Sequence, residues 1–129
     1  MTLFGQPKRE PPQTFRKDQR ILKRRDFQRV FERGKSFRSK WIIVRIEKTP
    51  EGAEKSKIGL VISRKVEPKA TRRNLWKRRV RNAVRLFASG MTPGFMVVVQ
   101  ARANPRLPKQ EEIEKELKAI LAESGAIKA

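Results

Sequence analysis

The sequence predicts an α+β fold in a single domain, with one sheet packed against helices. Two stretches, residues 37–48 and 57–66, alternate apolar and polar side chains, which is typical of half-buried strands. A third stretch, residues 95–102, is almost continuously apolar, as expected of an inner strand. Segments with helical spacing of apolar residues stand before, between and after these strands. With 129 residues, the chain is long enough for one modest core.

The N-terminal part divides into a tail and a first helix. Residues 1–17 are basic, rich in proline and without periodicity, so we expect a flexible basic tail before a domain spanning 18–124, with a short C-terminal tail at 125–129. Within 20–34, Phe27, Val30 and Phe31 recur at helical spacing, and Gly34 is placed to end the helix. This predicts a short helix of about three turns with one aromatic edge.

The first two strands have different faces. Residues 37–48 place Ile42, Val44 and Ile46 on one face. The other face is expected to carry Trp41, Ile43, Arg45 and Glu47. A turn within 49–56 then leads to the strand at 57–66, and we expect these two strands to pair antiparallel.

The central helix follows a basic connector and is expected to run from about residue 70 to 88. Its apolar stripe consists of Trp76, Val80, Ala83, Val84 and Phe87. The opposite side carries Asn74, Lys77, Arg78, Arg81 and Arg85. The interval from Pro68 to Gln110 holds eleven Lys and Arg and no acid. Like charges one turn apart repel, and a bound polyanion would relieve that repulsion. The alternative is an ordinary solvated helix surface, although such surfaces usually mix both signs.

The last helix is expected at residues 109–123. Its apolar side carries Ile113, Leu117, Ile120 and Leu121. The acidic start at Glu111, Glu112 and Glu114 suits the positive end of a helix dipole, and this explains the cluster better than a magnesium site does.

The charge predicts an anionic partner. Thirty-three Lys and Arg against thirteen Asp and Glu give a net charge of +20, most simply matched by nucleic acid. The longest apolar runs, 41–44 and 95–99, are far shorter than the roughly 20 residues that a membrane span requires. The chain has no cysteine, and its first residues lack the apolar core of a secretory signal, so we expect a cytoplasmic protein.

The same composition argues against a protein active site. Without histidine there is no imidazole base, Asp18 and Asp26 have no partner carboxylate at metal-binding spacing, and no glycine-rich phosphate loop is present. We therefore expect no catalytic residue and no metal bound by the protein. For stacking on bases, Phe27 and Phe31 are equally compatible with the core and with a cleft beside the sheet, and Arg45 is a candidate for the edge of that cleft.

At this point the sequence resembles the bacterial ribonuclease P protein subunit, from residue 15 to about 121. The resemblance is carried by residues 15–22, 26–31, 58–65, 73–81 and 97–102. Its most specific part is the family's Arg-Asn-Arg, aliphatic, Lys-Arg motif, which begins here at Arg73. Leu75 stands where the second arginine belongs, and Trp76 replaces the aliphatic residue. A helical wheel predicts that Leu75 points away from the face that carries Asn74.

The resemblance implies an αβββαβα order with a left-handed βαβ crossover, the first strand bending into two around Ser39. It also implies an accessory subunit of an endoribonuclease whose catalytic RNA removes the 5′ leader of precursor tRNA with magnesium. By motif position, the RNA-contacting residues are Arg73, Asn74, Lys77, Arg78 and Arg81. The helix face adds Arg85, and the basic connector adds Arg64 and Lys65.

For the leader, the resemblance implies a cleft lined by Phe27, Phe31 and Arg45. The partners it implies are the catalytic ribonuclease P RNA and the leader of precursor tRNA, with no membrane and no obligate protein partner. A small ribosomal protein that only folds RNA is the alternative function that the basic composition leaves open.

Overall fold

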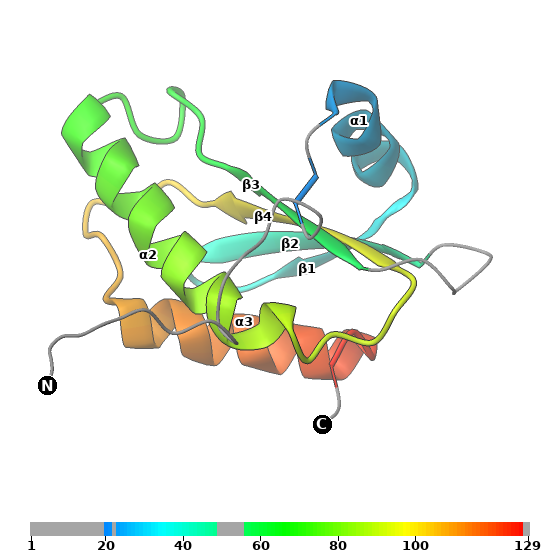
Figure 1. Ribbon diagram of the computed structural model, residues 1–129. Coiled ribbons are helices and arrows are strands. Elements are labelled where there is room, and N and C mark those ends of the chain that lie inside the picture. The colour runs from blue at the N-terminus through cyan, green and yellow to red at the C-terminus, as the bar shows by residue number, and fades with distance from the viewer. Residues whose placement is uncertain (1–19, 22, 49–55, 128–129) are drawn as a thin grey trace, which may run out of the picture.

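The computed structural model describes residues 20–21, 23–48 and 56–127. The expected N-terminal tail, most of the turn at 49–56 and the chain's last two residues lie outside these ranges. The elements, in order, are α1 (Arg24–Arg33), β1 (Lys35–Arg38), β2 (Ile42–Lys48), β3 (Lys57–Val61), α2 (Ala70–Ala88), β4 (Phe95–Ala101) and α3 (Gln110–Ser124) (Figure 1). This order and the single mixed sheet confirm the predicted α+β class.

The sheet has the strand order β1-β2-β4-β3. β4 pairs antiparallel with β2 and parallel with β3. The prediction that the strands at 37–48 and 57–66 pair with each other is therefore wrong, since β2 and β3 are not neighbours in the sheet. β4 separates them because its valines at 97, 98 and 99 are buried on both faces of the sheet, and only an inner strand offers that environment. The left hand of the β3–α2–β4 crossover stays a prediction from the resemblance.

The expected break in the first long strand is confirmed at Ser39. There the chain turns between β1 and β2, and the backbone N–H of Ser39 donates to the carbonyl of Ile42 at 2.9 Å. Glu116 on α3 holds this turn by accepting from the Trp41 backbone N–H at 3.0 Å. Trp41 lies in the turn and is buried in the main core, so the prediction that it shares a face with Ile43 is wrong.

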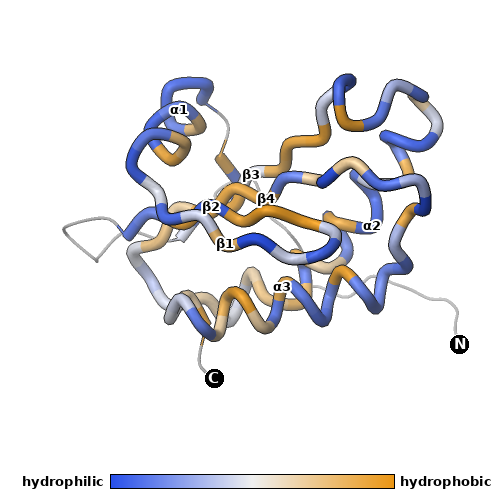
Figure 2. The backbone as a smooth tube through the Cα atoms, turned by 180° about the vertical axis from the view of Figure 1, so that it is seen from behind, coloured by the Kyte–Doolittle hydropathy of each residue, from blue (hydrophilic) through white to orange (hydrophobic). Residues whose placement is uncertain are grey.

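Helices cover the two faces of the sheet unequally. α2 and α3 pack together on one face, while α1 lies on the other (Figure 1). The main core forms under α2 and α3 from the apolar face of β2, the stripe of α2 that includes Trp76, and the apolar side of α3. Figure 2 shows the central strands β2 and β4 as largely apolar, β1 and most of α1 as hydrophilic, and α3 as alternating between the two.

α1 closes a smaller cluster on the second face. Val30 and Val98 are fully buried there, with Phe27 and Phe31 packed partly buried around them. The ring of Phe27 lies against Gly59 so closely that a Cβ at that glycine would come within 2.5 Å of ring carbon Cε1. Glycine on β3 therefore lets α1 approach the sheet.

Candidate nucleic-acid interface

The side of α2 turned away from the core is exposed along its whole length. Because α2 buries Trp76, Val80 and Val84 against the sheet and α3, the residues about half a turn away face outward. We call the resulting set the cationic face of α2: Asn74, Lys77, Arg78, Arg81 and Arg85, all exposed. Lys77, Arg78 and Arg81 form no ion pair within the described ranges of the chain.

The acids of α3 are the nearest large source of negative charge, and they do not neutralise this face. Glu112 pairs with Arg106 at 3.0 Å, and this hydrogen bond lowers the pKa of Glu112 to about 2. Glu116 is engaged by the turn at Ser39. α3 instead meets α2 along a flank, where Asn82 donates to the side chain of Gln110 at 3.3 Å. The cationic face is thus left free for an external anion.

Leu75 lies at one side of the cationic face. It is half-buried and lines the same surface hollow as Thr71, Asn74, Lys77, Arg78 and Arg81. On the helical wheel Leu75 lies about 100° or more from Asn74, Lys77 and Arg81, as predicted, but only about 60° from Arg78, so it lies beside that arginine. The apolar side chain where the family has an arginine therefore sits at the edge of the cationic face.

Arg73 differs from the other predicted RNA contacts. It is half-buried, and its Nη1 donates to the backbone carbonyls of Glu67 at 3.1 Å and Pro68 at 2.7 Å. This side chain ties the first turn of α2 to the connector before it. Arg64 and Lys65 are exposed in that connector, in a turn closed by Ser63, whose carbonyl accepts from the N–H of Glu67 at 3.0 Å.

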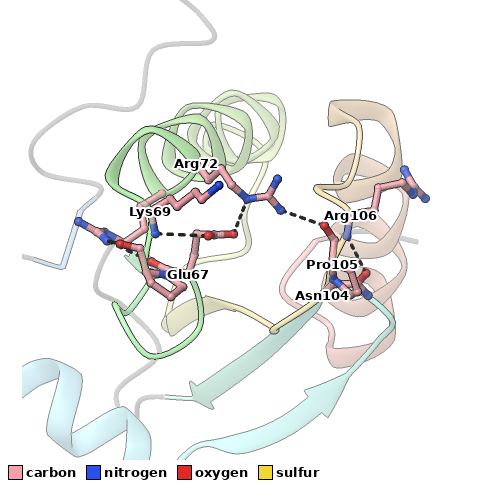
Figure 3. Close-up of polar contacts among 8 residues, drawn as sticks. Glu67, Lys69, Arg72, Asn104, Pro105 and Arg106 are labelled. Carbon is pink, nitrogen blue, oxygen red and sulfur yellow. Dashed lines mark hydrogen bonds and ion pairs between the residues drawn. The ribbon is translucent and has the colours of Figure 1, made fainter.

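A charged pair that the sequence analysis did not single out lies at the start of α2. Glu67 is buried, and the Nε of Arg72 donates to its Oε1 at 2.8 Å. Arg72 also donates to the backbone carbonyl of Pro105 at 3.1 Å and so bridges the connector and the loop between β4 and α3 (Figure 3). The hydrogen bond from Arg72 lowers the pKa of Glu67.

On the other face of the sheet, two of the three expected leader-binding residues come together. The guanidinium of Arg45 lies over the ring of Phe31, 5.2 Å from its centroid. Arg45 is fixed in this position by hydrogen bonds from Nε to the Gln100 side chain at 3.0 Å and from Nη1 to the Ser36 hydroxyl at 3.1 Å. Phe27 instead packs on Gly59 of β3, so its ring serves mainly to seat α1.

Two features that the described residues lack also bear on what the protein can do. Within the described ranges no cluster of three or more His, Cys, Asp or Glu side chains is placed to hold a metal ion. In the same ranges no helix combines the length and apolar character needed to cross a bilayer. What the described surfaces offer is an array of exposed cations on α2 and an aromatic–guanidinium stack beside α1, both suited to binding polyanions with exposed bases.

The fold and these surfaces define a small, strongly basic nucleic-acid-binding protein of the α+β class. A family model described as Ribonuclease P matches residues 15–125. The chain therefore belongs to the ribonuclease P protein family, the protein subunit of the tRNA-processing ribonucleoprotein, and its partner is ribonuclease P RNA.

Comparisons with individual relatives support this family assignment. The chain is 38% identical over 108 residues to the ribonuclease P protein component of a Picosynechococcus species, covering 84% of this chain and 91% of that protein. The solved ribonuclease P protein from Thermotoga maritima is 33% identical, with a TM-score of 0.67 over 81% of this chain and 96% of the other. The Staphylococcus aureus protein, 24% identical, shows the same fold with a TM-score of 0.72 over 86% of this chain and 99% of the other. Family membership decides against the ribosomal alternative.

Proposed function

We propose that the cationic face of α2, together with Arg64 and Lys65, binds ribonuclease P RNA, while the surface around Phe31 and Arg45 holds the 5′ leader of precursor tRNA. The observation that carries the first half is the row of exposed cations on α2 that have no acid partner in the described ranges. Lys and Arg side chains that displace the counterions condensed on RNA phosphates gain affinity from the release of those ions. The observation supports RNA binding, and work in the cytoplasm remains part of the proposal.

The leader half of the proposal rests on stacking. A single-stranded leader has unstacked bases, which bind aromatic rings and guanidinium planes. The stack of Phe31 and Arg45 supplies both, and its arginine also offers a charge to the leader backbone. Because Gln100 and Ser36 fix the arginine, little conformational entropy is lost when a nucleotide binds.

In this proposal the RNA cleaves the precursor tRNA, and the protein positions the leader relative to the RNA. Magnesium would be held by the RNA, where it would supply activation of the attacking water, and we expect the protein itself to hold no metal. The cationic face of α2 reduces the repulsion between RNA phosphates, and the leader surface fixes the scissile bond relative to the RNA. A protein with these surfaces lowers the magnesium concentration at which the RNA folds and cleaves.

Reconstitution tests this division of labour. The chain alone is expected to leave precursor tRNA intact at any magnesium concentration, and the chain plus its cognate RNA is expected to remove the leader at magnesium concentrations where the RNA alone is slow. Cleavage rates across a magnesium series, with and without the protein, measure the effect. Efficient leader removal by the polypeptide without RNA would overturn the proposal.

For the leader itself, substrates carrying zero to eight nucleotides 5′ of the tRNA should bind the holoenzyme more tightly as the leader grows.

Truncating Phe31 tests the leader surface more locally. Phe31→Ala is expected to remove one stacking contact of about 1–3 kcal/mol, so the affinity gained from the leader should fall by roughly 5- to 150-fold while binding of leaderless tRNA is unchanged. The matched control is Phe37→Ala, which removes another half-buried phenylalanine that packs against the main core. If Phe31→Ala unfolds the protein as readily as it weakens the leader contact, its ring belongs to the core.

A further inference from the structure

A cavity of about 670 Å³, wide open to the surface, lies where the connector before α2 meets the loop between β4 and α3. Val66, Pro68 and Pro105 give it apolar walls, and Glu67, Arg72 and Asn104 give it polar groups. We propose that this cavity receives one unpaired nucleobase of ribonuclease P RNA, and that the base is one with an exocyclic amino group. The inference rests on the proposed function, because it requires this end of α2 to face the RNA.

The two walls of the cavity are held together by one side chain. Arg72 donates from Nε to Glu67 Oε1 at 2.8 Å on one wall and to the carbonyl of Pro105 at 3.1 Å on the other (Figure 3). Both ends of the guanidinium are therefore fixed before any ligand arrives. A preformed cavity with apolar walls and a few fixed polar groups is what recognition of a small planar ligand requires.

Glu67 retains capacity to accept hydrogen bonds. A carboxylate has about four acceptor positions. Oε1 accepts from Arg72, and Oε2 accepts from the backbone N–H of Lys69 at a long 3.4 Å. Arg72 lowers the pKa of Glu67, so the carboxylate is ionised at neutral pH and cannot donate. An amino group on the ligand is therefore the natural partner.

This selects among the four bases. Adenine, cytosine and guanine each carry an exocyclic amino group, whereas the single pairing-edge donor of uracil, N3–H, lies between two carbonyl oxygens that an ionised carboxylate repels. Asn104 can complete the recognition: its Oδ1 accepts from the backbone N–H of Arg106 at 3.3 Å, and its amide nitrogen has no partner among the described residues. That nitrogen can donate to a ring nitrogen or carbonyl of the base.

The surroundings favour a nucleotide over a free anion. Lys69 is exposed at the rim, and the exposed Arg64 and Lys65 lie in the turn immediately before the cavity. A phosphate bound at this rim leaves its base to enter, while a phosphate inside the cavity would meet the Glu67 carboxylate. The lining residue Arg72 lies in the first turn of α2, two positions before Asn74, the first residue of the cationic face.

Chemical probing of ribonuclease P RNA tests the proposal. The full-length protein is bound at saturating concentration, and the RNA is treated with dimethyl sulfate, kethoxal or a carbodiimide, which together report the pairing edges of all four bases. One unpaired A, C or G is expected to lose reactivity about tenfold with the wild-type protein. Glu67→Gln, which replaces an acceptor by an amide, should restore most of that reactivity, as expected for one lost charge-assisted hydrogen bond.

The matched control is Glu112→Gln. It removes the same charge from another carboxylate paired with an arginine, outside the cavity, so it should keep the wild-type protection. Ala103→Leu narrows the cavity from the loop between β4 and α3 and leaves the Glu67 carboxylate in place, so it should weaken the protection even if Glu67→Gln folds poorly. Saturable RNA binding with no nucleotide whose protection depends on Glu67 and Ala103, or with a protected uracil, would overturn the cavity proposal alone. Loss of RNA binding by the wild-type protein would overturn the proposed function instead.

Discussion

Replacing Lys77 and Arg81 together by alanine is expected to weaken binding to ribonuclease P RNA by about 30-fold at 0.15 M salt. Each phosphate contact steepens the log–log dependence of affinity on salt by about 0.9, which corresponds to about fivefold in affinity at that concentration. Both side chains are exposed and unpaired within the described ranges, so their removal changes the RNA contact with little effect on the fold. Affinity measured between 0.05 and 0.5 M salt should show a slope flatter by about 2.

The matched control removes two cations from α3. Lys115 and Lys118 are exposed on that helix, away from the cationic face of α2, and the double alanine variant changes the net charge by the same amount. It should leave the salt slope within about 0.5 of wild type, since general attraction without direct phosphate contact contributes little. Equal losses in the two double variants would mean that total charge, and not the face of α2, determines binding.

The second large effect concerns the other side of the same helix. Trp76→Ala is expected to lower the free energy of unfolding by about 3–5 kcal/mol. The substitution removes the indole, the largest fully buried side chain among the described residues, and leaves a cavity in the core under α2. Typical domains of this size are stable by about 5–15 kcal/mol, so the variant should be partly unfolded at 37 °C. Urea denaturation followed by circular dichroism measures the change.

Leu86→Ala provides the control on α2 itself. Leu86 is 44% exposed, so its truncation should change the free energy of unfolding by no more than about 0.5 kcal/mol. A stably folded Trp76→Ala variant that has lost RNA affinity would show instead that the indole contacts RNA.

The elements of the fold followed from the sequence better than their pairing did. The bounds of α2 were predictable because Trp76, Val80 and Val84 mark one face of a helix that begins soon after Pro68. Strand partners were not, because alternation in β2 and β3 reports which side chains are buried and says nothing about the neighbouring strand. The continuous apolar run of β4 predicted an inner strand. It did not indicate that this strand lies between β2 and β3.

The candidate site likewise has one part that the sequence predicted and one part that it did not. The cationic face of α2 is a local helical pattern, so the spacing of Lys77, Arg78 and Arg81 predicted its exposure. The bridge from Glu67 through Arg72 to Pro105 joins residues up to 38 positions apart in a loop region, where no periodicity indicates contact. Likewise, the inward turn of Arg73 depends on connector carbonyls that the sequence does not place.

Directed hydroxyl-radical cleavage tests most directly whether α2 faces the RNA. The chain has no cysteine, so a single introduced thiol can carry a tethered iron chelate. Thr71→Cys lies at the cationic face of α2, and Ala119→Cys is exposed on α3. Both variants should bind ribonuclease P RNA like wild type, and we expect localised cleavage of the RNA from position 71 with none above background from position 119. Cleavage from position 119 alone would place α3 against the RNA and contradict the proposed role of α2.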